Sequence, residues 1–389
     1  MFMQQEYNDR IIETCKRVLL KNIGTFRGKS FLYAGQGQFR SFWTRDFCFS
    51  IPGLLAMGKA DVVRDHLLYL IQNRTRTHLI ARLLYVNNFK LQIIAKTGLR
   101  FFFRKEGRVR DPNSKVHVSV LGEHGTPSFD SNLLVILGLF ALHEDTQREF
   151  DFDISVYEQD VIELYNFYNK YFDGGLIVQP AYSDWQDSVK REGRTSYLHV
   201  LYWQVSKKIA EYGFMDVNHE VIRKKIFSSF TDGDTGLLIS ILGKPNVSLG
   251  TNLLALEFGL FEDSQKAYAS LKSTPLWRSD DLPGLATYPD YIRKNKSITT
   301  NWSGLEHYHD NMVWSWLIGK AIKVAKMMDD QDDADRSISQ LYELVIRDET
   351  ILEIYEPDTL NEFITTLYDS ENDFSWGSAI ILESLVYKK

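Results

Sequence analysis

Apolar residues recur along most of the chain with the spacing of one helical face, at positions i, i+3, i+4 and i+7. The segments with this spacing are 9–20, 50–73, 131–144, 155–172, 195–213, 252–261, 313–328, 334–348 and 375–387. Alternating strand patterns are scarce: 175–182 favours a short strand, and 235–243 fits a strand or a helix equally well. The pattern therefore predicts an all-α protein with short β segments.

Polar, aromatic-rich loops separate several of these helices. They cover 33–46, 179–193, 277–295, 301–312 and 355–363. Recurrent helix pairs with such loops indicate a closed ring of helical hairpins whose loops gather at one end. Because no Pro/Gly/Ser-rich linker or low-complexity tract divides the chain, we expect residues 1–389 to form a single domain.

Composition and charge narrow the class of protein. The 389 residues are 44% hydrophobic and 25% charged, as in soluble globular proteins, and the net charge of -6 argues against a nucleic-acid partner. Cys15 and Cys48 are too few for a disulfide framework and fit a reducing compartment. The N-terminus lacks an apolar signal core, and no apolar run reaches membrane-spanning length. We expect a cytoplasmic protein with no membrane partner.

One segment departs from this charge balance. Between Arg74 and Arg110 basic side chains dominate, and Glu106 is the acidic exception. A solvated face, an oligomer contact with an acidic neighbour, and a site for a phosphorylated or acidic ligand would all fit. A solvated face is the simplest interpretation, and the sequence leaves the oligomeric state open.

The stretch FWTRDFCFS, residues 42–50, places Arg45 and Asp46 among aromatic and apolar residues. Burying either charge alone would be costly, so each must be compensated by the other, by the backbone or by a polar ligand. Asp46 precedes an apolar run and suits the positive end of a helix there. A structural ion pair and a ligand contact are the two interpretations.

Aromatic residues make up 13% of the chain, and many lie in the predicted loops. Seven of the tryptophans stand close to acidic or polar residues: Trp43, Trp185, Trp277, Trp302, Trp314, Trp316 and Trp376. Flat rings beside carboxylates and amides suit a pyranose, whose C–H face packs on a ring while its hydroxyls form hydrogen bonds. Packing of a large helical core is the alternative for any single tryptophan.

Three loop motifs combine carboxylates with aromatic residues. They are YSDWQDS with Asp184 and Asp187, LEIYEPD with Glu353, Glu356 and Asp358, and GLEHYHDN with Glu306, His307, His309 and Asp310. Hydrolysis of a glycosidic bond requires one protonated carboxyl group and one carboxylate opposite it. A tryptophan-lined pocket would favour the protonated form of the acid.

The third motif also raises a metal-binding interpretation. His307 and His309 are two residues apart, which suits one face of a strand. Helical zinc pairs usually stand four residues apart and need a further ligand. We therefore expect no metal and a hydrogen-bonding role toward a sugar.

The motifs resemble those of a known group of enzymes. The stretch WTRD, residues 43–46, followed by an apolar helix, resembles glucoamylases, and the segment 45–68 looks like the equivalent helix of glycogen-debranching enzymes and neutral invertases. The segment 184–211 is similar to the one that carries the general acid in debranching enzymes and neutral invertases. The stretch 308–325 looks like their Tyr-His-Asn and Val-Trp-Pro-Trp stretch, with Asp310 in place of Asn and Ser315 in place of Pro. The segments 352–363 and 372–385 resemble the pattern around the Glu base.

The resemblance implies an (α/α)6 toroid with inverting glycoside hydrolase chemistry and no cofactor. It assigns the general acid to Asp187, with Asp184 as a substrate contact or fallback, and the base to Glu353, with Glu356 as the alternative. Arg45 and Asp46 would grip hydroxyls of the terminal sugar. The substrate-binding residues expected from these motifs are Trp43, Arg45, Asp46, Asp184, Trp185, Glu306, Tyr308, His309, Trp314 and Trp376.

The implied function is an exo-acting glycosidase on a small α-glucoside or related oligosaccharide. Alternatives on the same toroid are a neutral invertase-type sucrose hydrolase and a sugar 2-epimerase, for which His307 and His309 would be the candidate residues. A catalytically silent carbohydrate-binding protein is the alternative from another class.

Overall fold

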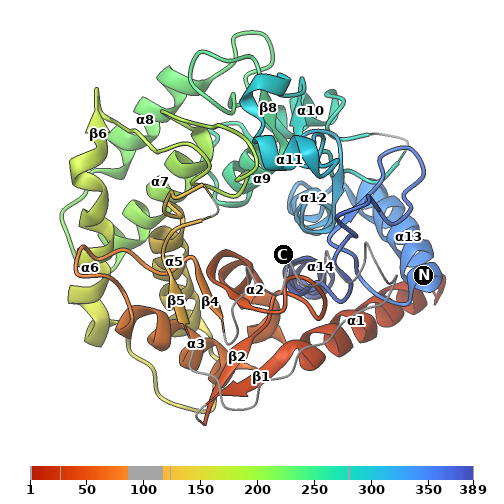
Figure 1. Ribbon diagram of the computed structural model, residues 1–389, viewed down its shortest axis with the longest axis horizontal. Coiled ribbons are helices and arrows are strands. Elements are labelled where there is room, and N and C mark those ends of the chain that lie inside the picture. The colour runs from red at the N-terminus through yellow and green to blue at the C-terminus, as the bar shows by residue number, and fades with distance from the viewer. Residues whose placement is uncertain (1, 27, 86–116, 123, 279–280, 389) are drawn as a thin grey trace.

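The computed structural model describes residues 2–26, 28–85, 117–122, 124–278 and 281–388. Within these residues, a ring of inner helices surrounds the centre of the molecule (Figure 1). The inner helices are α2 (Thr44–Ala56), α5 (Ser131–Glu144), α7 (Ser196–Glu211), α9 (Leu249–Glu257), α12 (Ser315–Met327) and α14 (Ser375–Val386). Each contacts the next, and α14 packs against α2, so the inner ring is closed.

A second layer of helices lies outside this ring. Its members are α1 (Phe2–Asn22), α3 (Ala60–Gln72), α6 (Glu158–Asn166), α8 (His219–Phe230), α10 (Ser264–Lys272) and α13 (Gln331–Asp348). Outer and inner helices alternate along the chain, and each outer helix packs on an inner one. This arrangement confirms the predicted (α/α)6 toroid. The short α11 (Ile298–Trp302) lies in the connection between α10 and α12.

The two layers differ in composition as their positions require. The inner helices α5 and α14 are apolar on nearly every side, whereas α13 has one apolar face and a charged outer face. Glycines let inner helices approach closely, because a Cβ on Gly53 of α2 would lie 2.4 Å from the Ala379 carbonyl oxygen of α14. Within the described ranges, no helix is both long and apolar enough to cross a membrane.

Short antiparallel strands lie in the loops that lead from outer to inner helices. They are β1 (Ile23–Phe26) with β2 (Lys29–Leu32), β3 (Phe42–Trp43) with β4 (Leu83–Tyr85) and β5 (His117–Ser119), β6 (Phe172–Asp173) with β7 (Leu176–Ile177), β8 (Val247–Ser248) with β9 (Thr287–Tyr288), and β10 (Val313–Trp314) with β11 (Ile354–Tyr355). The 3-10 helices cover Ile154–Tyr157, Phe167–Tyr171 and Arg293–Asn295.

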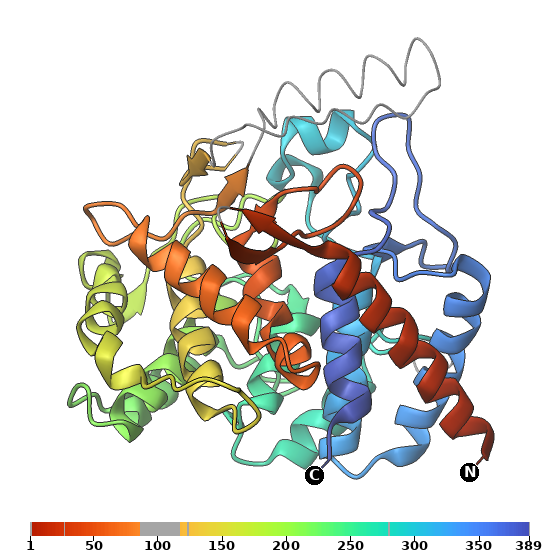
Figure 2. The ribbon, with the colours of Figure 1, turned by 90° about the horizontal axis from the view of Figure 1, so that it is seen from below.

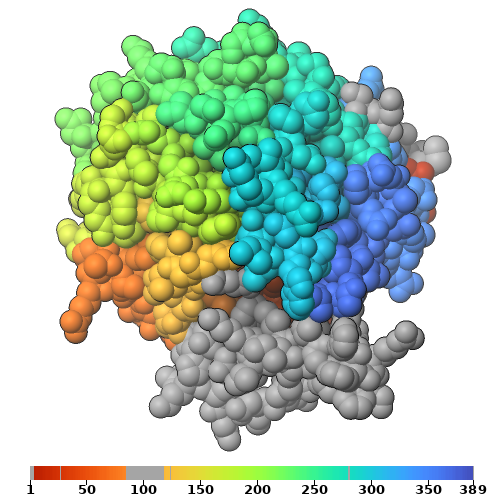
Figure 3. Space-filling model, turned by 45° about the horizontal axis from the view of Figure 1, so that its top comes forward, coloured from red at the N-terminus to blue at the C-terminus, as the bar shows by residue number. Residues whose placement is uncertain are grey.

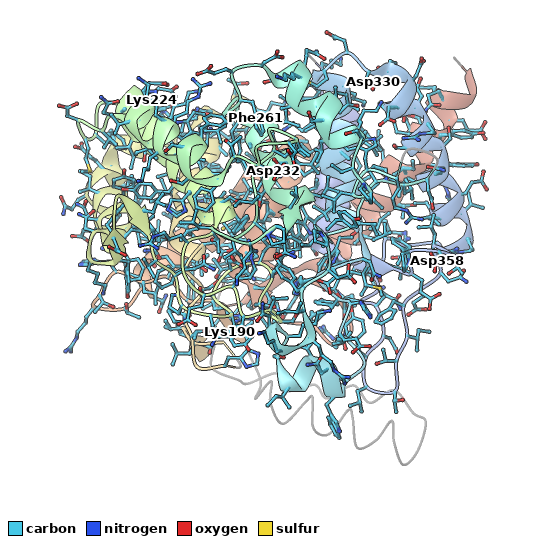
Figure 4. The ribbon with its side chains drawn as sticks, turned by 90° about the horizontal axis from the view of Figure 1, so that it is seen from above. Lys190, Lys224, Asp232, Phe261, Asp330 and Asp358 are labelled. Carbon is cyan, nitrogen blue, oxygen red and sulfur yellow. The ribbon has the colours of Figure 1, made fainter. Side chains whose placement is uncertain are left out.

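The two ends of the toroid differ. The connections from inner to outer helices are mostly short, and Phe261 and Asp330 mark two of them at the end opposite Lys190 (Figure 4). Both chain termini also lie at the end with the short connections (Figure 2). The long loops gather at the other end, as the sequence predicts, and the inner helices begin there.

Some predicted elements have different boundaries. The predicted helix 50–73 is interrupted, because Gly58 adopts a left-handed φ of 67° between α2 and α3. The predicted helix 155–172 is α-helical over 158–166 and continues in 3-10 turns. The segment 235–243 forms isolated bridges, such as Ile239 with Val247. The patterns did not predict α8 and α10.

Candidate active site

A cavity of about 460 Å³ opens at the loop end of the toroid, where the inner helices begin. Arg45 and Asp46 lie in the first turn of α2, Trp314 directly precedes α12, and Trp376 lies in the first turn of α14. Most of the predicted site residues line this cavity: Trp43, Arg45, Asp46, Trp185, Asp187, Tyr308, His309, Trp314, Glu353 and Trp376. The closed ring therefore brings together motifs that are far apart in the sequence.

Three of the carboxylates to which the sequence assigned a catalytic or substrate-binding role do not line the cavity. Asp184 is fully buried, where its Oδ1 accepts a hydrogen bond from Arg191 Nη1 at 3.1 Å. Glu306 is half-exposed beside His307, and Glu356 accepts a hydrogen bond from the Thr359 hydroxyl at 2.8 Å. Of the alternatives that the sequence left open, the cavity thus contains Asp187 and Glu353.

Arg45 is paired with Asp130, and not with its neighbour Asp46. Its Nε donates to Asp130 Oδ2 at 2.6 Å and its Nη2 to Asp130 Oδ1 at 3.0 Å, while Nη2 also donates to the Ser128 hydroxyl at 2.9 Å. Tyr197 donates its hydroxyl to the same Asp130 carboxylate. The two hydrogen bonds from Arg45 and the one from Tyr197 compensate the buried charges of Arg45 and Asp130. The remaining Nη1 points toward Asp187, 3.4 Å from its Oδ2.

Asp46 faces the cavity with its carboxyl group available. Within the described part of the chain, its side chain makes no hydrogen bond to another side chain. Burial raises the pKa of Asp46 to about 7, although the positive charge of Arg45 acts in the opposite direction. Near neutral pH this carboxyl group can therefore either accept or donate a hydrogen bond to a ligand hydroxyl.

Asp187 lies between two guanidinium groups. Arg82 Nη2 donates to its Oδ2 at 2.6 Å, and Arg45 approaches the same oxygen. Burial would raise the pKa of Asp187, but Arg82 and Arg45 outweigh it and hold the pKa below its ordinary value. Gly122 leaves room for Arg82, because a Cβ there would lie 1.9 Å from Arg82 Nη1. The Arg82 guanidinium also lies over the Trp43 ring, 5.5 Å from its centroid.

Glu353 is 3% exposed and accepts hydrogen bonds from two tyrosine hydroxyls, those of Tyr308 and Tyr368. It directly precedes β11, and its carbonyl oxygen accepts the Ser315 N–H at 3.1 Å. Burial raises the pKa of Glu353 to about 8, although the two hydroxyl donors oppose this shift. Asp187 and Glu353 are thus held in contrasting electrostatic environments.

Aromatic rings form the floor of the cavity. The Trp185 ring meets Trp314 edge to face at 5.7 Å, and His309 stacks on Trp314 at 5.3 Å. The His309 Nδ1 lies 2.6 Å from the Ser188 hydroxyl, and burial lowers the pKa of His309 to about 3, so the ring is neutral near pH 7. Trp376 closes the floor beside Trp314. Flat faces and neutral polar edges are what a pyranose requires.

The other tryptophans divide between the cavity and the core. Trp43 and Trp302 also line the cavity. Trp277 and Trp316 are fully buried outside it, and Trp277 donates its indole N–H to Asp333 at 3.0 Å. For these two residues, core packing is the correct interpretation.

The two histidines of the metal-binding interpretation, His307 and His309, have different surroundings. His307 lies with Asp290 and Asp310, whose potential ligand atoms are all within 4.8 Å of one another. The Asp310 carboxylate forms an ion pair with Lys296, so an ammonium group already neutralises the buried member of this cluster. His309 is not part of it.

The sequence did not single out Arg82, Tyr368 or Asp130 as site residues, and it named Trp302 only within the set of seven tryptophans. Arg82 belongs to the basic segment 74–110, and the excess of positive charge in this segment is the sequence feature that could have pointed to it. Within that segment, Arg74 pairs with Asp160 and Glu163, and residues 86–110 lie outside the described residues. Asp130 and Tyr368 carry no signal of their own, because their partners are far away in the sequence.

Neither a family model nor a curated protein matches this sequence. Solved structures match the fold. A rhamnosidase from Klebsiella oxytoca with rhamnose bound is 10% identical, with a TM-score of 0.64 over 97% of this chain and 64% of the rhamnosidase chain. The chain therefore spans less than two thirds of the length of that enzyme.

Two further structures are covered almost completely. A glycosidase variant in complex with glucose is 12% identical, with a TM-score of 0.63 over 97% of this chain and 96% of its own. A GH63 mannosylglycerate hydrolase from Thermus thermophilus in complex with glucose is 12% identical, with a TM-score of 0.63 over 96% of this chain and 99% of its own. The protein has the fold of the (α/α)6-toroid glycosidases.

Proposed function

We propose that residues 1–389 form one catalytic unit, an inverting glycoside hydrolase that removes the terminal sugar of a small α-glucoside. The observation that carries this proposal is that Asp187 and Glu353 line one cavity with an aromatic floor. Two carboxyl groups beside a sugar-sized cavity are the requirement of glycoside hydrolysis. The fold adds support by analogy alone, because it is shared with solved glycosidases.

The closed floor supports attack on a chain end. Trp185, Trp314 and Trp376 line the cavity and are almost fully buried, so the cavity ends in the interior of the toroid on their side. A terminal pyranose would pack on these rings, while Arg45 and Asp46 would hold its hydroxyls. Two of the matching structures contain glucose, which favours glucose as the sugar in this subsite.

In the proposed reaction, Asp187 gives its proton to the glycosidic oxygen as the bond between that oxygen and the anomeric carbon breaks. Glu353 takes a proton from a water molecule whose oxygen bonds to the anomeric carbon from the opposite face. The Asp187 side chain is 26% exposed and Glu353 is 3% exposed. This difference supports the assignment, because the leaving group departs toward the opening and the acid must lie beside it.

One observation favours the exchanged roles. The pKa of Glu353 is raised to about 8, and the pKa of Asp187 is lowered. At neutral pH, Glu353 then holds a proton that an acid could give, and Asp187 is ionised as a base must be. The hydroxyls of Tyr308 and Tyr368 favour the carboxylate form of Glu353 and therefore support the first assignment.

The variants Asp187→Asn and Glu353→Gln distinguish the two assignments. We expect Asp187→Asn to reduce kcat/KM for an unactivated disaccharide by 10²- to 10⁴-fold, roughly the contribution of general acid catalysis, and to spare α-glucosyl fluoride. Glu353→Gln should depress both reactions, because the water loses its base in each. Glucose release from both substrates is the measurement, and the opposite pattern would establish the exchanged roles.

The pH profile of kcat/KM gives an independent readout of the same question. If Glu353 is the base, kcat/KM rises as pH increases through about 8, because only the ionised form accepts the proton. If Glu353 is the acid, kcat/KM falls through the same range. Glu356→Gln, which changes a carboxyl outside the cavity, serves as the control and should keep the wild-type profile.

Anomer-resolved NMR of the first product tests inversion. An α-glucoside should release β-glucose, and early α-glucose would contradict the inverting mechanism. Product analysis also separates the other functions: fructose from sucrose would indicate an invertase, a 2-epimer without hydrolysis an epimerase, and binding without product a silent carbohydrate-binding protein.

A further inference from the structure

The cavity has a buried floor and an exposed edge. Of the described lining residues, those that are exposed are Thr299, Trp302 and Thr366, and we call these three the rim. Trp302 is 81% exposed, whereas the floor residues Trp185 and Trp376 are 2% and 4% exposed. The rim thus presents one indole ring and two hydroxyls at the opening.

The helix that carries Trp302 is held from both sides. At its start, the Ser297 hydroxyl accepts the Thr300 N–H, and the Ser297 N–H donates to the Ser188 carbonyl at 2.9 Å. After its end, the Thr365 hydroxyl donates to the Ser303 carbonyl at 2.9 Å. Figure 3 shows the segment around residue 300 between that around residue 190 and the C-terminal part of the chain. The backbone that carries the indole is therefore anchored at the opening.

One of these anchors relates the rim to the candidate acid. Ser188 directly follows Asp187, and its carbonyl holds the start of α11. A group that protonates the glycosidic oxygen must lie next to the leaving group. Through Ser188, the backbone of α11 is hydrogen-bonded to the segment that carries Asp187, and both Asp187 and Trp302 line the cavity.

We propose that Trp302 forms a subsite for the leaving group and that this leaving group is a neutral sugar ring. The proposal rests on the proposed function. An indole face that is exposed to water gains from covering by the C–H face of a pyranose, while the hydroxyls of Thr299 and Thr366 match its edge. The substrate class proposed from this rim is therefore a disaccharide or short oligosaccharide.

The test compares Trp302→Ala and Trp302→Phe with Ile298→Ala, a change on the same helix at a residue that is 87% exposed and does not line the cavity. Substrates are α-glucosyl fluoride, which has no second ring, and the disaccharide that the wild type cleaves fastest among kojibiose, nigerose, maltose and isomaltose. Trp302→Ala should raise KM for the disaccharide about tenfold, the equivalent of ~1.4 kcal/mol, and leave the fluoride unchanged. Trp302→Phe should keep most of the affinity, and Ile298→Ala all of it.

Equal KM values in Trp302→Ala and the wild type, or an equal loss on both substrates, would overturn the subsite. Cleavage of an α-glucoside of glycerate at least tenfold faster than any of the disaccharides would overturn the neutral leaving group. Neither result would contradict the proposal that the protein is a glycoside hydrolase.

Calorimetric titration of glucose and the four disaccharides separates the two proposals. If the wild type hydrolyses nothing, the proposed function fails, and the subsite is then judged by binding alone. It stands if a disaccharide binds more tightly than glucose and loses this advantage in Trp302→Ala. It fails if no disaccharide binds more tightly than glucose.

Discussion

Glu353, the proposed base, shows how a buried carboxyl group opposes stability at the level of one residue. Its carboxyl is buried among aromatic side chains, and its pKa rises from an ordinary 4.5 to about 8. Between these two pH values, the folded chain holds a proton that the unfolded chain releases. Raising the pH through this range therefore lowers the free energy of unfolding.

The variant Glu353→Gln lacks this titration. The free energy of unfolding of the variant minus that of the wild type should therefore increase as the pH rises from 5 to 9. The pKa shift limits the increase in this difference to at most ~5 kcal/mol at high pH. The weaker hydrogen bonds of an amide to Tyr308 and Tyr368 reduce the gain. Urea unfolding at several pH values measures it. Glu356→Gln is the control and should follow the wild type, and an advantage of Glu353→Gln that shrinks with rising pH would contradict the burial argument.

The sequence pointed to residues that line the cavity when they stood in short motifs, and it missed residues whose partner is supplied only by the fold. Arg45, Asp46, Asp187 and Glu353 each lie in a motif with aromatic neighbours. The carboxylate that pairs with Arg45, Asp130, is 85 residues away, and nothing local marks it. Partner choice depends on which loops the closed ring brings together, so it cannot be read from spacing.

The loop that follows β2 shows how an element depends on one buried side chain. The Glu371 carboxylate accepts the backbone N–H groups of Gly37, Gln38 and Phe39. The two loop residues Gln38 and Phe39 line the cavity. The Glu371 carbonyl also accepts the N–H of Glu353 at 3.0 Å, so one residue connects the cavity wall with the candidate base.

Glu371→Gln should raise KM several-fold and move the pH profile of kcat/KM to lower pH. The first effect follows because an amide cannot accept all three N–H groups as well as a carboxylate. The second follows because the negative charge of Glu371 contributes to the raised pKa of Glu353. Kinetics between pH 5 and pH 9 measure both.

Gly37→Ala provides the matched variant, because its Cβ would lie 2.9 Å from the Glu371 carboxylate oxygens while the charge remains. It should raise KM without moving the pH profile. A pH shift of equal size in both variants would exclude the charge of Glu371 as its cause.

Element prediction succeeded for the inner helices because their apolar residues extend over many turns. The outer helices α8 and α10 were missed, since each buries only a few residues: Ile226 and Phe230 in α8, and Ala267, Tyr268 and Leu271 in α10. Such narrow stripes stand out little from loop sequence. The break at Gly58 was missed because the apolar spacing continues across it.

Closure of the whole ring depends on glycines where inner helices cross. Gly53 of α2 packs against the Ala379 backbone of α14. A Cβ on Gly319 of α12 would lie 2.8 Å from the backbone nitrogen of Ile381, which also belongs to α14. The obstacle in each case is backbone, which cannot rotate away. These crossings keep α14 between its two neighbours.

Gly53→Ala and Gly319→Ala should each destabilise the protein by ~1–3 kcal/mol, because overpacking outweighs the gain in helix propensity. Gly233→Ala is the control: nothing lies within 4 Å of its Cβ, and its backbone is not left-handed, so stability should change little. Thermal unfolding of the three variants decides this. A Tm for Gly53→Ala equal to the wild type would show that α2 and α14 can separate without cost.

The contact between α14 and α2 joins segments that are more than 300 residues apart in a closed circle. On a ribosome, α2 emerges early and keeps one apolar side uncovered until nearly all of the chain has been made. Loop closure of this length slows folding, and the waiting surface is prone to aggregation. The closed ring that shapes the cavity of this protein thus makes its newly synthesised chain a natural client for chaperones.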